Sequence, residues 1–117
     1  FVVVGDGELQ EGSNWEALAF IRHHGLTNIT VIVDYNRLQA IEPVRDVLTL
    51  DLMVRFRGWG FNPVLIDGHY LPELKTVLGC HYQTIVALTV KGRGFPLMEG
   101  DPKFHYRIPN EQERTPR

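Results

Sequence analysis

Oxygen-bearing side chains follow two apolar segments in the first third of this sequence. Asp6 lies in Gly5-Asp6-Gly7, directly after an apolar run, and Asn36 ends the Asp34-Tyr35-Asn36 segment that follows another. Asp6 and Asn36 are 30 residues apart, about the length of one β-α-β unit. A carboxylate, an amide oxygen and a bare glycine turn before a helix suit a hard cation bound to a diphosphate. The residue types and their spacing therefore predict a site that anchors such a cofactor.

The elements that must position these residues alternate between strand and helix. Short apolar runs predict strands, and apolar residues at helical spacing predict the helices between them. The strands are expected at 1–5, 29–33, 62–66 and 84–90, and the helices at 13–24, at 48–59 and around Leu71, Leu74 and Leu78. This order predicts an α/β fold, a parallel sheet with helices on its faces. Parallel strands end at the same edge of the sheet, so Asp6 and Asn36 should meet there.

Glycine and proline mark the segments without periodicity. Arg37 to Asp46 contains Pro43 and is predicted to be a loop, and the chain after Lys91 is predicted to be loop or tail. Gly25 stands where a glycine ends a helix, and Pro72 fits the first turn of the third helix.

Composition limits the classes of function. At 117 residues the chain is long enough for one domain with a real core. A formal net charge of −2 predicts no general affinity for nucleic acid or membranes, and no apolar run approaches the roughly 20 residues that cross a bilayer. Cys80 is the only cysteine, so no intrachain disulfide forms, and a reducing compartment, the cytoplasm, is expected.

The chain opens inside a strand-like run. Phe1 to Val4 carries no polar lead-in, and a strand buried on both faces needs neighbours that the sequence does not offer before it. We therefore interpret the chain as a fragment of a longer protein whose missing part lies upstream.

A set of short motifs runs through essentially the whole chain. They are Gly5-Asp6-Gly7, Glu11-Gly12, Trp15-Glu16-Ala17, Asp34-Tyr35-Asn36, Glu42-Pro43-Val44, Gly58-Trp59-Gly60, Asp67-Gly68-His69, Val90-Lys91-Gly92-Arg93-Gly94 and His105. Together these motifs resemble the thiamine-diphosphate motif of transketolases, above all that of the N-terminal subunits of two-chain transketolases.

The resemblance implies a thiamine-diphosphate-binding fold and a metal site. The side chains of Asp6 and Asn36 and the backbone carbonyl of Leu38 would bind Mg²⁺, or Ca²⁺ or Mn²⁺ in its place, and diphosphate oxygens and water would complete an octahedron. Gly7 would offer its N–H to the diphosphate. The implied cofactor-binding set is Gly5, Asp6, Gly7, Asn36, Leu38 and His105.

The resemblance also implies two catalytic residues. Glu11 matches a carboxylate that lies in a proton relay between paired active sites, and His105 matches a histidine near the diphosphate and the substrate. Members of the family often have glycine after this histidine, where this chain has Tyr106. The covalent chemistry belongs to the cofactor, which the protein orients and activates.

The implied function is transfer of a two-carbon ketol unit between sugar phosphates. Residues 1–100 would form the C-terminal part of the diphosphate-binding domain, and residues 101–117 a tail leading out of it. The fragment alone would be inactive, because the glutamate that activates the cofactor lies on a pyrimidine-binding domain or subunit. We expect a homodimer or heterotetramer. The alternatives are another thiamine-diphosphate enzyme, deoxyxylulose-phosphate synthase or the first component of a 2-oxo acid dehydrogenase, and a catalytically inactive binding or scaffold module.

Simpler interpretations stand beside these. Asp6 could be an ordinary turn residue, and Glu11 could be a helix-start acid favoured by the helix dipole. Gln10 occupies the third glycine position of a dinucleotide fingerprint, which excludes that motif. Lys91 and Arg93 could contact a phosphorylated substrate or a partner subunit, or could be a solvated pair.

Overall fold

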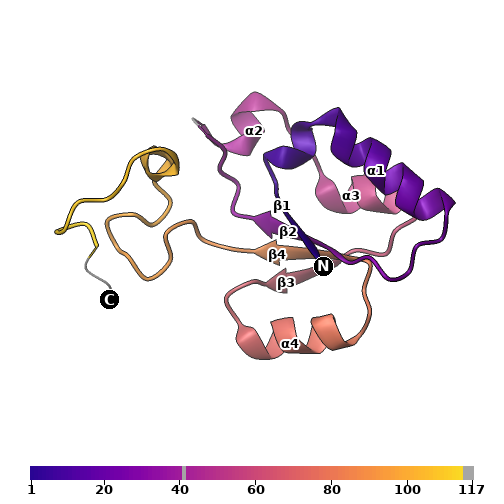
Figure 1. Cartoon of the computed structure of the whole chain (residues 1–117). Helices are drawn as coiled ribbons and strands as arrows, with labels where there is room; N and C mark the ends of the chain where they lie inside the picture. The colour runs from indigo at the N-terminus through magenta and orange to yellow at the C-terminus, as the bar shows by residue number, and fades with distance from the viewer. Residues whose placement is uncertain (41, 115–117) are drawn as a thin grey trace.

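Four parallel strands form the sheet. The computed structural model describes residues 1–40 and 42–114. The strands are β1 (Val2–Gly5), β2 (Val31–Tyr35), β3 (Val64–Asp67) and β4 (Thr84–Leu88), in the order β1-β2-β4-β3 (Figure 1). All three neighbouring pairs are parallel, so the predicted α/β fold with a parallel sheet is confirmed. The second strand extends two residues beyond its prediction, which places Asp34 and Tyr35 in the sheet.

The connections between strands are helical. The α-helices are α1 (Gly12–His23), α2 (Val44–Val47), α3 (Leu52–Gly58) and α4 (Leu71–Gly79), with 3-10 turns η1 (Glu8–Gln10) and η2 (Pro102–His105). Pro72 lies in the first turn of α4, and Gly25 follows α1 with a φ of +61°, as predicted. Figure 1 shows α1 and α3 on one face of the sheet and α4 on the other.

The segment between β2 and α3 differs from its prediction. The helix expected from Leu48 begins at Leu52, because Asp51 caps it by accepting a hydrogen bond from the Val54 N–H at 3.0 Å. The expected loop contains the short α2, which starts after Pro43, and a β-bridge between Leu38 and Pro43. Residue 41 lies outside the described residues.

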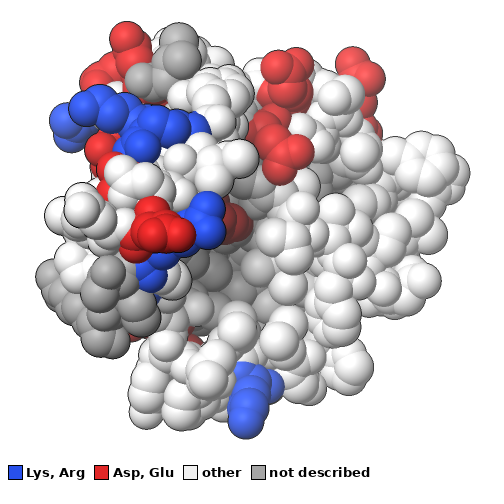
Figure 2. All heavy atoms as spheres, turned by 60° about the vertical axis from the view of Figure 1, so that its left-hand side comes forward, with Lys and Arg blue, Asp and Glu red and all other residues white. Residues whose placement is uncertain are grey.

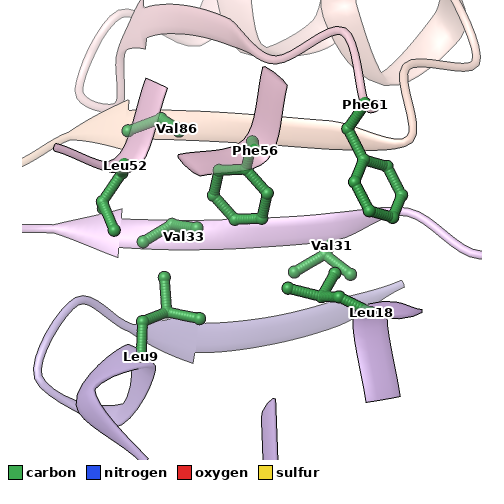
Figure 3. Packing of buried hydrophobic residues seen from close by; sticks show 8 residues of the cluster. All are labelled: Leu9, Leu18, Val31, Val33, Leu52, Phe56, Phe61 and Val86. Carbon is green, nitrogen blue, oxygen red and sulfur yellow. The ribbon is translucent and has the colours of Figure 1, made fainter. Parts of the chain in front are cut away.

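Side chains alternate between two cores on the two faces of the sheet. One core joins β2 and β4 to α1 and α3 (Figure 3), and consists of Leu9, Leu18, Val31, Val33, Leu52, Phe56, Phe61 and Val86. The other core, under α4, consists of Ile66, Val77, Ile85 and Ala87. Adjacent residues of β2 and β4 therefore face opposite cores, which explains why these strands are continuous apolar runs.

The prediction that the first strand is buried on both faces is wrong for this structure. In the part of the chain that the structure describes, β1 pairs with β2 alone and lies at an edge of the sheet. The side chain of Val3 is 66% exposed and that of Val2 is 49% exposed. The apolar run correctly indicated a parallel strand, but burial also depends on neighbours that a run of valines does not specify.

The chain after β4 first forms a closed loop. The Gly100 N–H donates to the Lys91 carbonyl at 2.9 Å, and Gly92 lies inside the loop with a φ of +75°. A Cβ at Gly92 would lie 2.7 Å from the Met98 carbonyl oxygen, so glycine is required there.

The predicted tail 101–117 contains η2 and an ion pair. Two hydrogen bonds of 2.9 and 2.6 Å join the Arg107 guanidinium to the Glu113 carboxylate, and residues 115–117 lie outside the described residues. Among the described residues, no helix has the length and apolar character needed to cross a membrane.

Candidate functional site

Asp6 is buried in the turn after β1, with 1% of its surface exposed. Its Oδ1 accepts a hydrogen bond from the Gly7 N–H at 2.9 Å, and its Oδ2 accepts one from the Arg37 N–H at 2.6 Å. The Arg37 residue belongs to the turn after β2. Asp6 therefore joins the ends of β1 and β2, and the expected meeting of these two turns at one edge of the sheet is present in the structure.

Burial raises the pKa of the Asp6 carboxyl above its usual value. The charge of nearby Asp34 raises the pKa further, while the hydrogen bonds from the Arg37 and Gly7 N–H groups act in the opposite direction. Among the described residues, no Lys or Arg side chain forms an ion pair with Asp6 or Asp34. The site therefore holds a buried carboxylate with a second carboxylate close by, and within the described ranges neither forms an ion pair with a Lys or Arg side chain.

Asn36 follows β2 and has both ends of its amide engaged. Its Oδ1 accepts a hydrogen bond from the Leu38 N–H at 2.9 Å, and its Nδ2 donates to Asp34 Oδ2 at 3.3 Å. A carbonyl oxygen has two lone pairs, so Oδ1 retains one for a metal ion. Arg37, between Asn36 and Leu38, has a φ of +65°, an uncommon conformation for a residue with a side chain.

The Gly7 N–H has an internal hydrogen-bond partner in this structure. This N–H, expected to bind a diphosphate, donates to Asp6 Oδ1. A Cβ at Gly7 would lie 2.9 Å from the Gln39 Cβ, so the neighbour that requires glycine here is the loop after β2. Diphosphate binding through this N–H would therefore replace an existing internal hydrogen bond.

A cleft of about 650 Å³ brings every predicted site residue together. Gly5, Asp6, Gly7, Glu11, Asn36, Leu38 and His105 all line it. The cleft opens at the edge where the strands end, and Figure 2 shows the molecule from this side. Charged side chains of both signs gather in the upper half of that view, and few lie on the surface below and to the right.

The two predicted catalytic residues lie at the rim of this cleft and are exposed. Glu11 directly precedes α1, and its side chain makes no capping hydrogen bond. His105 ends η2, and its ring packs edge-on against that of Tyr106 at 4.7 Å between centroids. Residues from both ends of the sequence thus line the same cleft.

The cleft is also lined by residues outside the predicted site set. Asp34, Glu8, Gln39 and Lys91 line it. Lys91 follows β4. Of the Lys and Arg residues that the structure describes, it is the one that lines this cleft, which makes it the cation available to an anionic ligand there. The sequence signal for this role is that Lys91 directly follows the last apolar run, because the end of that strand lies at the same edge of a parallel sheet as Asp6 and Asn36.

A second cavity of about 380 Å³ is also lined by Asp6 and reaches residues of α2 and α3. Its walls include Tyr35, Val44, Leu50 and Leu52, so it is lined largely by apolar side chains. It shares Asp6 and Leu38 with the predicted metal set.

The residues of the cleft fit a hard divalent cation bound to a diphosphate. No group of three or more His, Cys, Asp or Glu residues in the described ranges could hold a metal by itself. The predicted site does not require such a group, because it combines one carboxylate, one amide oxygen and one main-chain carbonyl with oxygens of the cofactor. The unneutralised Asp6 carboxylate is the observation that fits a cation.

Comparisons with known proteins agree on one family. The family model described as "Transketolase, thiamine diphosphate binding domain" matches residues 1–112. Human transketolase is 38% identical over 90% of this chain, which corresponds to 18% of that protein. One of the subunits of the apulose-4-phosphate transketolase of Actinobacillus succinogenes is 32% identical over 97% of this chain and 43% of that protein.

Solved structures show the same fold. The transketolase of Campylobacter jejuni superposes on 86% of this chain and 17% of its own with a TM-score of 0.80 and 29% identity. A Pichia stipitis transketolase in complex with sedoheptulose-7-phosphate covers 87% of this chain and 16% of its own, with a TM-score of 0.79 and 25% identity. The chain thus spans about a fifth of the length of the first curated relatives, so it corresponds to a fragment of them.

Proposed function

Because the chain belongs to the family of transketolase thiamine-diphosphate-binding domains, we propose that it supplies the diphosphate and Mg²⁺ site for ketol transfer between sugar phosphates. The observation that carries this proposal is the convergence of Asp6, Asn36 and Leu38 on one cleft at the carboxyl edge of the sheet. The buried carboxylate without a protein counter-ion supports a cation there.

In the proposed site, three oxygen donors hold the metal. The Asp6 carboxylate, the second lone pair of Asn36 Oδ1 and the Leu38 carbonyl would bind Mg²⁺, with Ca²⁺ or Mn²⁺ as substitutes. Gly5 and Gly7 would border the diphosphate, and Lys91 would contribute the positive charge that it needs. The metal would act as a template and charge neutraliser.

Bound thiamine diphosphate would supply the reactive carbon and the electron sink for the two-carbon transfer. The residues of this chain would hold its diphosphate end. His105 is exposed at the rim of the cleft and would contact both the diphosphate end and the substrate. Glu11, which also lines the cleft, would take part in a proton relay with a partner's active site.

The proposal includes a partner. The glutamate that activates the cofactor would come from a pyrimidine-binding domain or subunit, in a homodimer or heterotetramer, and this fragment would be inactive alone. One relative is named as one subunit of a transketolase, which supports a divided enzyme. The free Cys80 thiol is compatible with a reducing compartment, and we place the enzyme in the cytoplasm.

Titration of thiamine diphosphate with and without Mg²⁺ tests the site, using the longest natural polypeptide that contains this sequence. Asp6→Ala should abolish the Mg²⁺-dependent part of the binding. Asp46→Ala is the matched control, because Asp46 is an exposed aspartate of α2 that does not line the cleft. Unchanged affinity in Asp6→Ala would exclude the proposed site.

The substrate is tested separately. With its partner domain present, the enzyme should transfer a ketol unit from a ketose phosphate to an aldose phosphate. Release of carbon dioxide from pyruvate would instead identify a decarboxylating thiamine-diphosphate enzyme. Cofactor binding without any turnover would identify a scaffold module.

A further inference from the structure

Asp34 is a second carboxylate in the cleft, and the proposed function gives it no task. It lies on β2 beside Gly5 of β1 and lines the cleft with Asp6 and Asn36. Its Oδ2 accepts from Asn36 Nδ2 at 3.3 Å, and its Oδ1 accepts from the hydroxyl of Thr89. Both oxygens of Asp34 are therefore held, one by a proposed metal ligand and one by a residue that follows β4.

The contacts of Asn36 allow one orientation of its amide. Its NH₂ group faces the Asp34 carboxylate, and its oxygen faces the Leu38 N–H. If the amide were flipped, its oxygen would face the Asp34 carboxylate and its NH₂ group would face the Leu38 N–H, so both contacts would become repulsive. Asp34 thus helps to fix which end of the amide is available to a cation.

Thr89 is itself fixed by the end of the sheet. Its N–H donates to the Tyr35 carbonyl at 3.2 Å. The turn after β3 packs against it so closely that a Cβ at Gly68 would lie 2.7 Å from the Thr89 Cγ2. Thr89 is therefore held by a backbone hydrogen bond to β2 and by the close approach of the turn after β3 to its Cγ2.

We propose that Asp34, held by Thr89, is a positioning residue that directs the Asn36 carbonyl oxygen toward the metal. This inference rests on the proposed function, because it concerns the same site. The chain of contacts runs from Thr89, after β4, through Asp34 to Asn36. It extends the site to Thr89 and Asp34, which are not among the proposed metal ligands. Such outer residues commonly change metal affinity by about 10- to 100-fold when they are removed.

The test measures Mn²⁺ affinity in the presence of thiamine diphosphate by the electron paramagnetic resonance signal of free Mn²⁺, on the longest natural polypeptide. Asp34→Ala should weaken Mn²⁺ binding by about 10- to 100-fold. Asp34→Asn should remain within a few-fold of wild type, because its oxygen can face Asn36 while its NH₂ group donates to the Thr89 hydroxyl, which also accepts. Equal losses in the two variants would show that only the charge matters and would overturn the positioning role.

Thr89 provides an independent pair of variants that leave every charge in place. Thr89→Val should weaken Mn²⁺ binding toward the lower end of that range, and Thr89→Ser, which keeps the donor, should restore it. If Asp34→Ala does not fold in a thermal unfolding control, this pair decides the question. Wild-type affinity in Thr89→Val would contradict the proposal while leaving the proposed function intact. If the wild-type protein does not bind Mn²⁺ in the presence of thiamine diphosphate, both the proposed function and the positioning role are overturned.

Discussion

Gly7 provides a sharp test of how the two turns fit together. Its backbone has φ −65° and ψ −34°, which alanine adopts readily, so any penalty of Gly7→Ala must come from contacts. The new Cβ would lie 2.9 Å from the Gln39 Cβ, against an optimum of about 3.5–4.0 Å between carbon atoms. The Gln39 Cβ is fixed to the backbone, so the loop after β2 must move to relieve this overlap.

The expected magnitude follows from that overlap. Overpacking of this kind costs about 1–3 kcal/mol, offset by about 0.4–1 kcal/mol from the lower backbone entropy of alanine in the unfolded chain. The displaced loop carries Asn36 and Leu38. If binding requires the original loop position, the same 1–3 kcal/mol lowers the affinity for thiamine diphosphate and Mg²⁺ by about 5- to 150-fold.

Thermal unfolding and calorimetric titration measure the two effects, with Gly12→Ala as the matched control. Nothing lies within 4 Å of a Cβ at Gly12, so that variant should lose neither stability nor affinity. Adding Gln39→Gly to Gly7→Ala removes the atom that the new Cβ meets and should recover the affinity. A Gly7→Ala protein that is as stable as Gly12→Ala and binds like wild type would refute the reasoning.

Three further predictions follow from burial and charge. Mg²⁺-dependent cofactor binding should weaken as the pH falls through the raised pKa of the Asp6 carboxyl, because the protonated group no longer binds the cation. In the metal-free protein, the stabilisation contributed by this carboxyl should be complete below its unfolded pKa of 3.8 and should be lost as the pH rises through its folded pKa; titrations and unfolding curves with Asp6→Ala as reference test both effects. Lys91→Ala should weaken diphosphate binding and reduce the salt dependence of that binding. Lys75→Ala, on α4 outside the cleft, should change neither, and unchanged salt dependence in Lys91→Ala would exclude contact between Lys91 and the diphosphate. Phe56→Ala should destabilise the protein by about 3–5 kcal/mol in denaturant unfolding, because Phe56 is fully buried. Val54→Ala, at an exposed position of the same helix, should change stability by less than about 0.5 kcal/mol, and similar losses in the two variants would contradict the packing of this core.

The sequence predicted the meeting of Asp6 and Asn36 because the rule for parallel strands is geometric. Each residue follows a buried run, and parallel runs end at one edge of the sheet, so no side-chain detail was needed. The same argument, applied to the end of β4, would have placed Lys91 in the cleft. The resemblance to transketolases supplied His105 and Glu11, which no local pattern places in the cleft.

Other features depend on contacts between distant residues and had no local signal. The exposure of Val3 reflects the position of β1 at an edge, and strand order does not follow from a run of valines. The late start of α3 is the exception, because Asp51 is a capping residue that marks this start locally. The positive φ of Arg37 and the bond between Thr89 and Asp34 required the assembled sheet.

The measurement that tests the central claim most directly is calorimetric titration of thiamine diphosphate, with and without Mg²⁺, into the longest natural polypeptide and its Asn36→Ala variant. Asn62→Ala serves as the control, because Asn62 is exposed and lies outside the cleft. The account predicts Mg²⁺-dependent binding in the wild type and in Asn62→Ala, and its loss in Asn36→Ala. Binding without Mg²⁺ dependence, or Mg²⁺-dependent binding that survives in Asn36→Ala, would contradict it.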